Sequence, residues 1–94
     1  MAEKSGIVFI GSKTPMDYVL AIITGLSASN AKEITLKARG QAITTAVDAA
    51  EITRRRFLKD LKISKITIGT EEIEEKETGR TRSVSTIEIT LTCR

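Results

Sequence analysis

The chain has 94 residues, is 40% hydrophobic but only 3% aromatic, and carries 15 basic and 12 acidic side chains. This length predicts one domain with a modest core of Ile, Leu, Val and Ala, and the small positive charge favours acidic partners. The absence of His and the single Cys93 exclude an intrachain disulfide, a Cys/His zinc cluster and an imidazole-dependent triad. No apolar run approaches the ~20 residues of a membrane span and no signal peptide is evident, so we expect a cytoplasmic or chromosome-associated protein with no membrane partner.

The first expected elements are a strand over residues 7–10 and a helix over residues 15–26. The strand is a continuous apolar run, which is typical of a strand buried on both faces rather than of an edge strand. Thr14 is a good N-cap, Pro15 suits the first helical position, and Asp17 complements the helix dipole. Helical spacing predicts an apolar stripe made of Met16, Val19, Leu20, Ile23 and Leu26.

A second strand is expected from Ile34 to Arg39. Its period of two places Ile34, Leu36 and Ala38 on one face, and Lys37 and Arg39 on the other. Gly40 then permits a sharp turn that a residue with a Cβ would resist. From Gln41 the apolar spacing changes to about 3.6, which marks the start of a helix.

This second helix is expected to run from about Gln41 to Asp60. Its predicted apolar stripe contains Ile43, Val47, Ala50 and Leu58, with Ala46 and Phe57 at the edge. Ile52 falls nearly opposite Val47, on the face that should be wet, so this helix could meet another subunit through Ile52 and Phe57. The run Arg54-Arg55-Arg56 is typical of a C-terminal turn in which cations offset the dipole, although one of them, with Arg55 as the candidate, could extend a phosphate-binding surface.

Two further strands are expected over residues 62–69 and 86–93. In the last strand Ile87, Ile89, Leu91 and Cys93 alternate with polar residues, so Cys93 is expected to face inward as a small buried thiol. The intervening residues 70–85 are charged and rich in Thr, and predict a hairpin that extends beyond the body with its turn at Thr78-Gly79-Arg80. Between Thr70 and Arg82 there are five Glu against three basic residues.

Three cations are expected at one edge of the sheet. Lys13 precedes the first helix as Lys37 and Arg39 precede the second, and parallel strands deliver their strand-to-helix loops to the same edge. Cations beside a helix N-terminus are favourable partners for phosphate, which predicts a nucleic-acid-binding surface. The chain has no Walker motif, no G-x-G-x-x-G and no acid/base pair held by a core, so we expect neither an enzyme nor a cofactor.

The sequence resembles the Alba family of small archaeal chromatin proteins (Sac10b-like proteins) over nearly its whole length. The motifs that carry the resemblance are I-G-S-K-T-P-M-D-Y-V (residues 10–19), I-T-L-K-A-R-G-Q-A-I (34–43), A-V-D-A-A-E-I-T-R-R-R-F-L (46–58) and V-S-T-I-E-I (84–89). The resemblance implies a single nucleic-acid-binding domain over residues 1–94 with an α/β (α+β sandwich) fold. Its order is β-α-β-α-β-β, with a four-stranded mixed sheet, two helices and a hairpin arm at about residues 70–85, similar to the C-terminal domain of translation initiation factor three.

The resemblance also implies the function and its contacts. Family members form homodimers that bind double-stranded DNA, and also RNA, with little sequence preference, and they coat and compact chromosomal DNA. Family members bind phosphates through the loop of Lys13 and the K-A-R-G segment, and the dimer's hairpins reach along the minor groove. The residues that this assigns to nucleic acid are Lys13, Lys37, Arg39, Arg80 and Arg82. Phe57 matches an aromatic through which family dimers touch along DNA.

Three departures from the family pattern affect these expectations. Ser12 stands where the family loop often has its first lysine, so control of Lys13 by an acetylase and a deacetylase is doubtful in site and effect. Gln41 replaces a further cation, and the hairpin is acidic. Ser12, Gln41 and Arg55 complete the set of candidate contacts. Two alternatives stay open: a ribonucleoprotein subunit that works through protein contacts on Ile52 and Phe57, and a paralogue that modulates a more basic Alba protein by heterodimerising with it.

Overall fold

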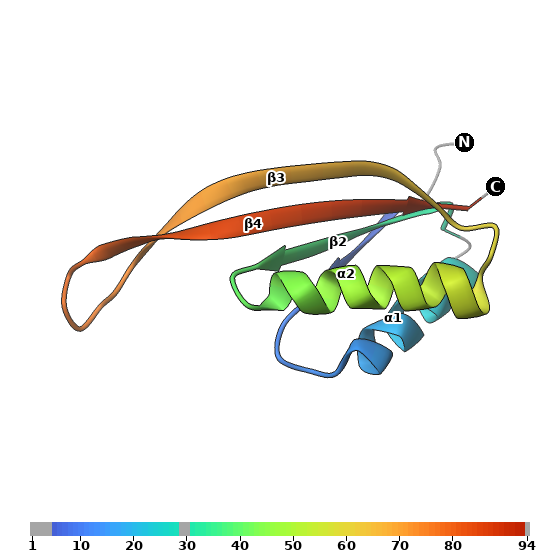
Figure 1. Cartoon of the computed structure of the whole chain (residues 1–94), viewed down its shortest axis with the longest axis horizontal. Coiled ribbons are helices and arrows are strands. Elements are labelled where there is room, and N and C mark those ends of the chain that lie inside the picture. The colour runs from blue at the N-terminus through green and yellow to red at the C-terminus, as the bar shows by residue number, and fades with distance from the viewer. Residues whose placement is uncertain (1–4, 29–30, 94) are drawn as a thin grey trace.

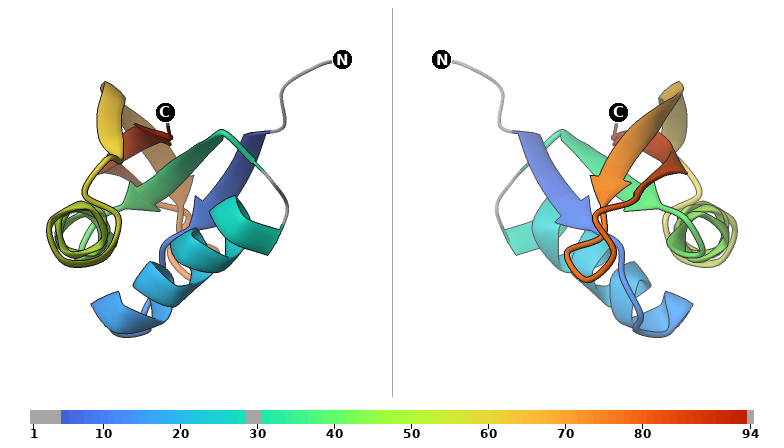
Figure 2. Two further views of the ribbon diagram at one scale, coloured as in Figure 1. Left: turned by 90° about the vertical axis from the view of Figure 1, so that its right-hand side faces the viewer. Right: turned by 90° about the vertical axis from the view of Figure 1, so that its left-hand side faces the viewer.

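The computed structural model describes residues 5–28 and 31–93 of the chain. Four strands form one mixed sheet in the order β1-β2-β4-β3, in which β1 and β2 are parallel and the other neighbours antiparallel. Two helices lie on one face of this sheet (Figures 1 and 2), so the predicted fold class is confirmed. The elements are β1 (Ser5–Phe9), α1 (Pro15–Ala28), β2 (Glu33–Arg39), α2 (Ala42–Ile52), a π-helical turn (Thr53–Phe57), β3 (Lys62–Glu74) and β4 (Thr81–Thr92).

The core forms between the helices and strands β1, β2 and β4. Along β2 the buried side chains are Ile34, Leu36 and Ala38, as the period of two predicts. Their partners across the sheet on β4 are Leu91, Ile89 and Ile87, of which the first two are buried and Ile87 half-buried. Cys93 is half-buried and packs against the same core, on the inward side that its position predicts.

The expectation that the first strand is buried on both faces is wrong. β1 pairs with β2 alone and forms one edge of the sheet. The helices cover only the face that carries Val8 and Ile10, so Ile7 is 54% exposed and Phe9 74% exposed on the other face. A continuous apolar run is therefore compatible with an edge strand when one of its faces has no cover.

Helix α1 starts as predicted but buries a different set of side chains. The Asp17 carboxylate accepts hydrogen bonds from the Thr14 backbone N–H and hydroxyl, while the Asp17 N–H donates to the Thr14 carbonyl. The buried residues are Tyr18, Val19, Ile22 and Leu26, and Ile23 is half-buried. The predicted members Met16 and Leu20 are exposed, because the helix turns Tyr18 and Ile22 rather than those two toward the sheet.

Helix α2 is turned relative to its predicted stripe. Its buried residues are the small side chains Ala46, Ala49 and Ala50, which allow close approach to the sheet, and Thr53 is buried in the π-helical turn that follows. The larger Val47 and Phe57 are exposed on one flank. On a wheel of 100° per residue, Ile52 lies on the flank opposite Val47, and there it packs half-buried against the core rather than in water as expected. The apolar side chains of α2 and of the turn after it thus extend beyond the part that packs against the core of this chain.

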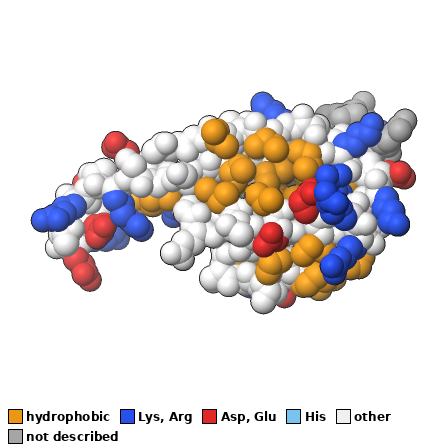
Figure 3. All heavy atoms as spheres, in the orientation of Figure 1, with side chains coloured by type: hydrophobic (Ala, Val, Ile, Leu, Met, Phe, Trp, Pro, Cys, Tyr) orange, Lys and Arg blue, Asp and Glu red, His pale blue; other side chains and the backbone are white. Residues whose placement is uncertain are grey.

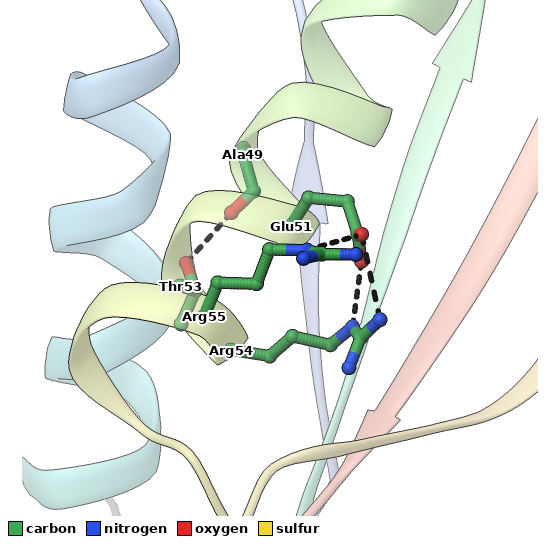
Figure 4. A network of polar contacts seen from close by, with 5 residues as sticks. All are labelled: Ala49, Glu51, Thr53, Arg54 and Arg55. Carbon is green, nitrogen blue, oxygen red and sulfur yellow. Dashed lines mark hydrogen bonds and ion pairs between the residues drawn. The ribbon is translucent and has the colours of Figure 1, made fainter.

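The second helix ends at Phe57, earlier than the predicted Asp60. The Leu58 N–H donates to the Thr53 carbonyl at 2.7 Å, five residues back, which makes the last turn π-helical. The buried Thr53 hydroxyl donates to the Ala49 carbonyl at 2.7 Å (Figure 4). Such back-bonding competes for the acceptors of a regular helix, and this is the physical reason we assign to the irregular end.

The long hairpin of β3 and β4 extends beyond the helix layer (Figure 1), as predicted. The paired strands reach Glu74 and Thr81, and Gly79 adopts a φ of +69° in the turn. Helix α2 packs on β2 and β4 rather than on β3, so the inner face of β3 has little cover. Within the described residues, neither helix is long and apolar enough to cross a membrane.

Candidate nucleic-acid interface

The turn at Gly40 places two cations at the end of β2, next to the start of α2. Gly40 has a φ of +59°, and its N–H donates to the Ser85 carbonyl on β4 at 2.9 Å. An L side chain at this φ would be strained, so the glycine allows β2 to stop and α2 to begin within two residues. Lys37 and Arg39 therefore leave the outer face of the sheet, away from the helices, as the sequence predicted.

The loop of Lys13 lies at the same edge of the sheet. The Ile10 N–H donates to the Lys37 carbonyl at 2.9 Å, which joins the end of β1 to β2. Tyr18 of α1 anchors the loop, because its hydroxyl accepts hydrogen bonds from Gly11 N–H at 2.8 Å and Lys13 N–H at 3.1 Å. The structure thus brings Lys13, Lys37 and Arg39 to one edge, which we call the cation edge.

Both β2 cations are paired with carboxylates of this chain. The Lys37 ammonium lies 3.8 Å from Glu88 on β4, and the Arg39 guanidinium donates to Glu71 on β3 at 2.5 Å. All four side chains are more than one third exposed, so water screens these pairs and each contributes at most ~1 kcal/mol. Lys13 forms no ion pair with any described residue. Sequence reasoning placed the cations but missed these partners, because the pairing of β2 with β4 and of β4 with β3 decides them.

The hairpin carries the other predicted cations beyond the body of the domain. The Arg82 guanidinium lies 3.7 Å from Glu75. Arg80 is exposed and enters no ion pair among residues 5–28 and 31–93, and basic side chains are visible at the end of the hairpin in Figure 3. Ser12 and Gln41 are both exposed at the cation edge, where Gln41 precedes α2 and forms no capping hydrogen bond through its side chain.

Arg55 lies at the other end of α2, roughly 20 Å from Gly40 at 1.5 Å per residue. Arg54 and Arg55 converge on Glu51, with Nε to carboxylate distances of 2.6 and 2.9 Å (Figure 4). The hydrogen bonds from Arg54 and then Arg55 hold the pKa of the Glu51 carboxyl below its ordinary value. The structure therefore does not bring Arg55 to the cation edge, and its side chain is engaged on the helix itself.

An exposed apolar surface lies beside the hairpin. Ile66 is 56% exposed and Ile68 78% exposed, although both project toward the helix side of the sheet. Figure 3 shows hydrophobic side chains gathered on this side of the molecule, between β3 and α2. We call this surface the open apolar face, and it consists of Ile43, Val47, Phe57, Ile66 and Ile68.

No metal site is evident at these surfaces. Among the described residues, no group of three or more His, Cys, Asp and Glu side chains could hold a metal ion. The concave regions near the cation edge are open grooves rather than enclosed cavities. This geometry suits a large ligand that lies across the surface.

Comparison with known proteins identifies the family. The sequence model of the Alba family matches residues 6–70. The DNA/RNA-binding protein Alba of Methanococcus maripaludis is 48% identical over 85 residues, which are 90% of this chain and 94% of that protein. The chain belongs to the Alba family.

Further relatives agree with this membership. DNA/RNA-binding protein Alba 1 of Archaeoglobus fulgidus is 50% identical over 91 residues, and these cover 97% of both chains. The solved structure of Alba from Thermoplasma volcanium superimposes with a TM-score of 0.83 at 46% identity, covering 92% of this chain and 98% of that one. The Alba fold therefore extends over nearly the whole chain, including most of the hairpin.

Tyr18 is a residue of this Alba site that sequence reasoning missed. The ring of Tyr18 is buried among apolar side chains of α1, as any core residue would be. Only the hydroxyl, which accepts hydrogen bonds from the loop, distinguishes it as a loop anchor. Buried Tyr hydroxyls usually find a hydrogen-bond partner, so a Tyr one turn after a loop is the available signal.

We expect Tyr18→Phe to loosen the loop of Lys13 without changing the fold. Loss of the acceptor for two backbone N–H groups should lower the free energy of unfolding by about 1 kcal/mol. Amide hydrogen exchange at Gly11 and Lys13 should become faster. Thr35→Val, which removes a hydroxyl bonded to Thr90 on the sheet, is the control and should leave both amides protected. Unchanged exchange in Tyr18→Phe would contradict the anchoring role.

Proposed function

We propose that this chain binds double-stranded nucleic acid without sequence preference, through phosphate contacts from the cation edge. The observation that carries the proposal is the convergence of Lys13, Lys37 and Arg39 at one edge of the sheet, beside the start of α2. Cations and a helix N-terminus are favourable phosphate partners. The names of the Alba relatives, which describe binding of DNA and RNA, support the same ligand class.

We propose that the binding unit is a homodimer formed through the open apolar face. Exposed apolar side chains that gather between a strand and a helix are typical of an interaction site. Ile43, Ile68 and Ile87 line a shallow groove of about 430 Å³ there, which the side chains of a second copy could fill. Two copies would double the cation edge to six anchors and place two hairpins on one ligand.

The hairpins are the second contact in this proposal. Arg80 and Arg82 lie at the far end of the β3–β4 arm, where they would reach the minor groove beyond the body. The five Glu residues of the arm would repel phosphate along its stem, which leaves most of the affinity to the cation edge.

Coating and compaction of chromosomal DNA would follow from such binding when dimers touch along the duplex. Phe57 is exposed at the end of the helix layer and is our candidate for that contact, whereas Ile52 is half-buried and less suited to it. Lys13, exposed in its loop, is the candidate for acetylation at the cation edge. Removal of its charge would take away the one anchor of the cation edge that has no carboxylate partner among the described residues.

The first test replaces Lys37 and Arg39 together by Ala. Six anchors predict that log K falls by roughly 5 per decade of salt, and the variant dimer with two anchors by roughly 2. Affinity for a duplex at low salt should fall by at least tenfold. Fluorescence anisotropy over a salt series measures both quantities.

Lys59→Ala with Lys62→Ala is the matched control for this test. It removes the same charge from two exposed lysines at the opposite end of the sheet. The control should keep the steep salt dependence. If it weakens binding as much as the Lys37/Arg39 variant, or if the latter changes nothing, the assignment of the cation edge fails.

The second test concerns the dimer. Ile68→Asp places a charge on the open apolar face at a position that is 78% exposed, so the monomer should fold while the dimer dissociates. Sedimentation equilibrium should give the mass of one chain. Ile7→Asp introduces the same charge on the opposite face of the sheet and should remain dimeric. A dimeric Ile68→Asp protein would rule out this interface.

A further inference from the structure

The outer face of the sheet carries an exposed aromatic side chain that the proposed duplex contacts do not use. Phe9 is 74% exposed and Ile7 54% exposed, and both project from the side of β1 that the helices leave open. Of the three aromatic residues, Tyr18 is buried in the core, and Phe57 lies at the end of the helix layer. Phe9 is therefore the single aromatic ring on the outer sheet face.

The neighbours of Phe9 across the sheet are charged. Phe9 lies opposite Lys37 on β2, and Lys37 lies opposite Glu88 on β4. A shallow groove of about 570 Å³ runs over these residues, with Arg39 and Glu71 also in its lining. In the next row across the sheet Thr86 pairs with Arg39 on one side and with Gly69 on the other, so two of its three residues are small.

We propose that this groove binds unpaired nucleotides of a single strand, with one base stacked on the ring of Phe9. The inference rests on the proposed function, because Lys37 and Arg39 serve both ligands, and it adds a second ligand form. An open sheet face with an exposed aromatic flanked by cations is the arrangement that single-strand binders use, since every base has a face that can stack.

The charges of the groove favour a nucleotide over a purely apolar occupant. A phosphate next to the stacked base can take the place of Glu88 on Lys37 or of Glu71 on Arg39, since both pairs are solvent-exposed. The released carboxylates are then acceptors for the amino groups of a base. Cations and carboxylates beside one aromatic ring therefore match the phosphate, the base edge and the base face of a nucleotide.

The outer sheet face also stays available in the proposed dimer. The open apolar face lies on the helix side of the sheet, while Phe9, Lys37 and Glu88 lie on the other side. A homodimer would thus expose two such grooves, each continuous with a cation edge. A structured RNA could place a duplex on the cation edges and an adjacent unpaired segment on the groove.

The test compares Phe9→Ala with the intact protein on two probes, a single-stranded RNA of about eight nucleotides and a duplex of about 20 base pairs. Loss of one stacked base, worth ~1–3 kcal/mol, should weaken single-strand binding about tenfold. Duplex binding should change less than about twofold, because phosphate contacts dominate it. Leu20→Ala removes an exposed apolar side chain of α1 that lies outside both proposed contact surfaces. It is the matched control, with single-strand affinity expected to be unchanged.

A direct reading of stacking comes from Phe9→Trp. The chain has no Trp, so the new side chain is the only indole, and a stacked base should quench its fluorescence when the RNA is added. Leu20→Trp, on the exposed side of α1, should not respond. Single-strand affinity unchanged by Phe9→Ala, an equal loss in Leu20→Ala, or an unquenched indole each overturns the inference.

The two proposals can fail separately. If the intact protein binds the duplex through Lys37 and Arg39 but Phe9→Ala has no effect on the single strand, only the groove is refuted. If Phe9→Ala weakens single-strand binding while the Lys37/Arg39 variant binds duplex normally, the duplex anchors are refuted and the groove stands. Absence of binding to both probes refutes both.

Discussion

The alternation of side chains along β2 is the constraint on which the rest of the structure depends. Ile34, Leu36 and Ala38 lie at the centre of the core, while Lys37 and Arg39 leave the other face of the same strand. A register shift of one residue would bury the cations and expose the core residues, so the fold and the cation edge are specified together. Gly40 then ends the strand directly after Arg39, and α2 begins two residues later at Ala42.

The two helices cover β1, β2 and β4 but leave apolar side chains of β3 exposed. Helix α2 approaches the sheet through small side chains, and its larger apolar residues stay on the flank that faces the uncovered β3. A chain of this size gains limited stability from its own core. A second copy on the open apolar face would supply the missing cover, and it would also place two cation edges on one ligand. Stability and affinity would then both depend on the same contact.

The sequence predicted the parts of this structure that follow local rules. The strands, the turn at Gly40, the cap at Thr14 and the direction of Lys37 and Arg39 come from period, turn chemistry and short-range hydrogen bonds. The errors concern which apolar side chains find a partner. Phe9, Leu20 and Val47 read as core residues, yet they are exposed, because the sheet order and the rotation of each helix decide their cover. Tyr18 was not identified, since its role depends on a hydroxyl that reaches a loop seven residues away.

The ion pairs of Lys37 and Arg39 could not be predicted from the sequence either, because they depend on strand pairing. They bear on how a phosphate would reach the two cations. Of the five hairpin glutamates, Glu71 reaches Arg39 across the sheet. Glu88 of β4, which is outside that set, reaches Lys37. We infer that duplex phosphates would take the positions of these carboxylates, as proposed above for the single strand, so each bound phosphate would displace a glutamate. In this proposal the two weak pairs would orient Lys37 and Arg39 before binding and would lower the affinity for nucleic acid.

The most direct test of this account measures duplex affinity after Glu71→Gln is combined with Glu88→Gln. Without the competing carboxylates, the dimer should bind roughly tenfold more tightly at fixed salt, an effect of about 1.4 kcal/mol spread over four weak exposed pairs. Glu72→Gln with Glu74→Gln removes the same charge from hairpin carboxylates that form no ion pair within the described residues, and it should tighten binding much less. Equal effects of the two variants, or no gain in the first, would contradict the account.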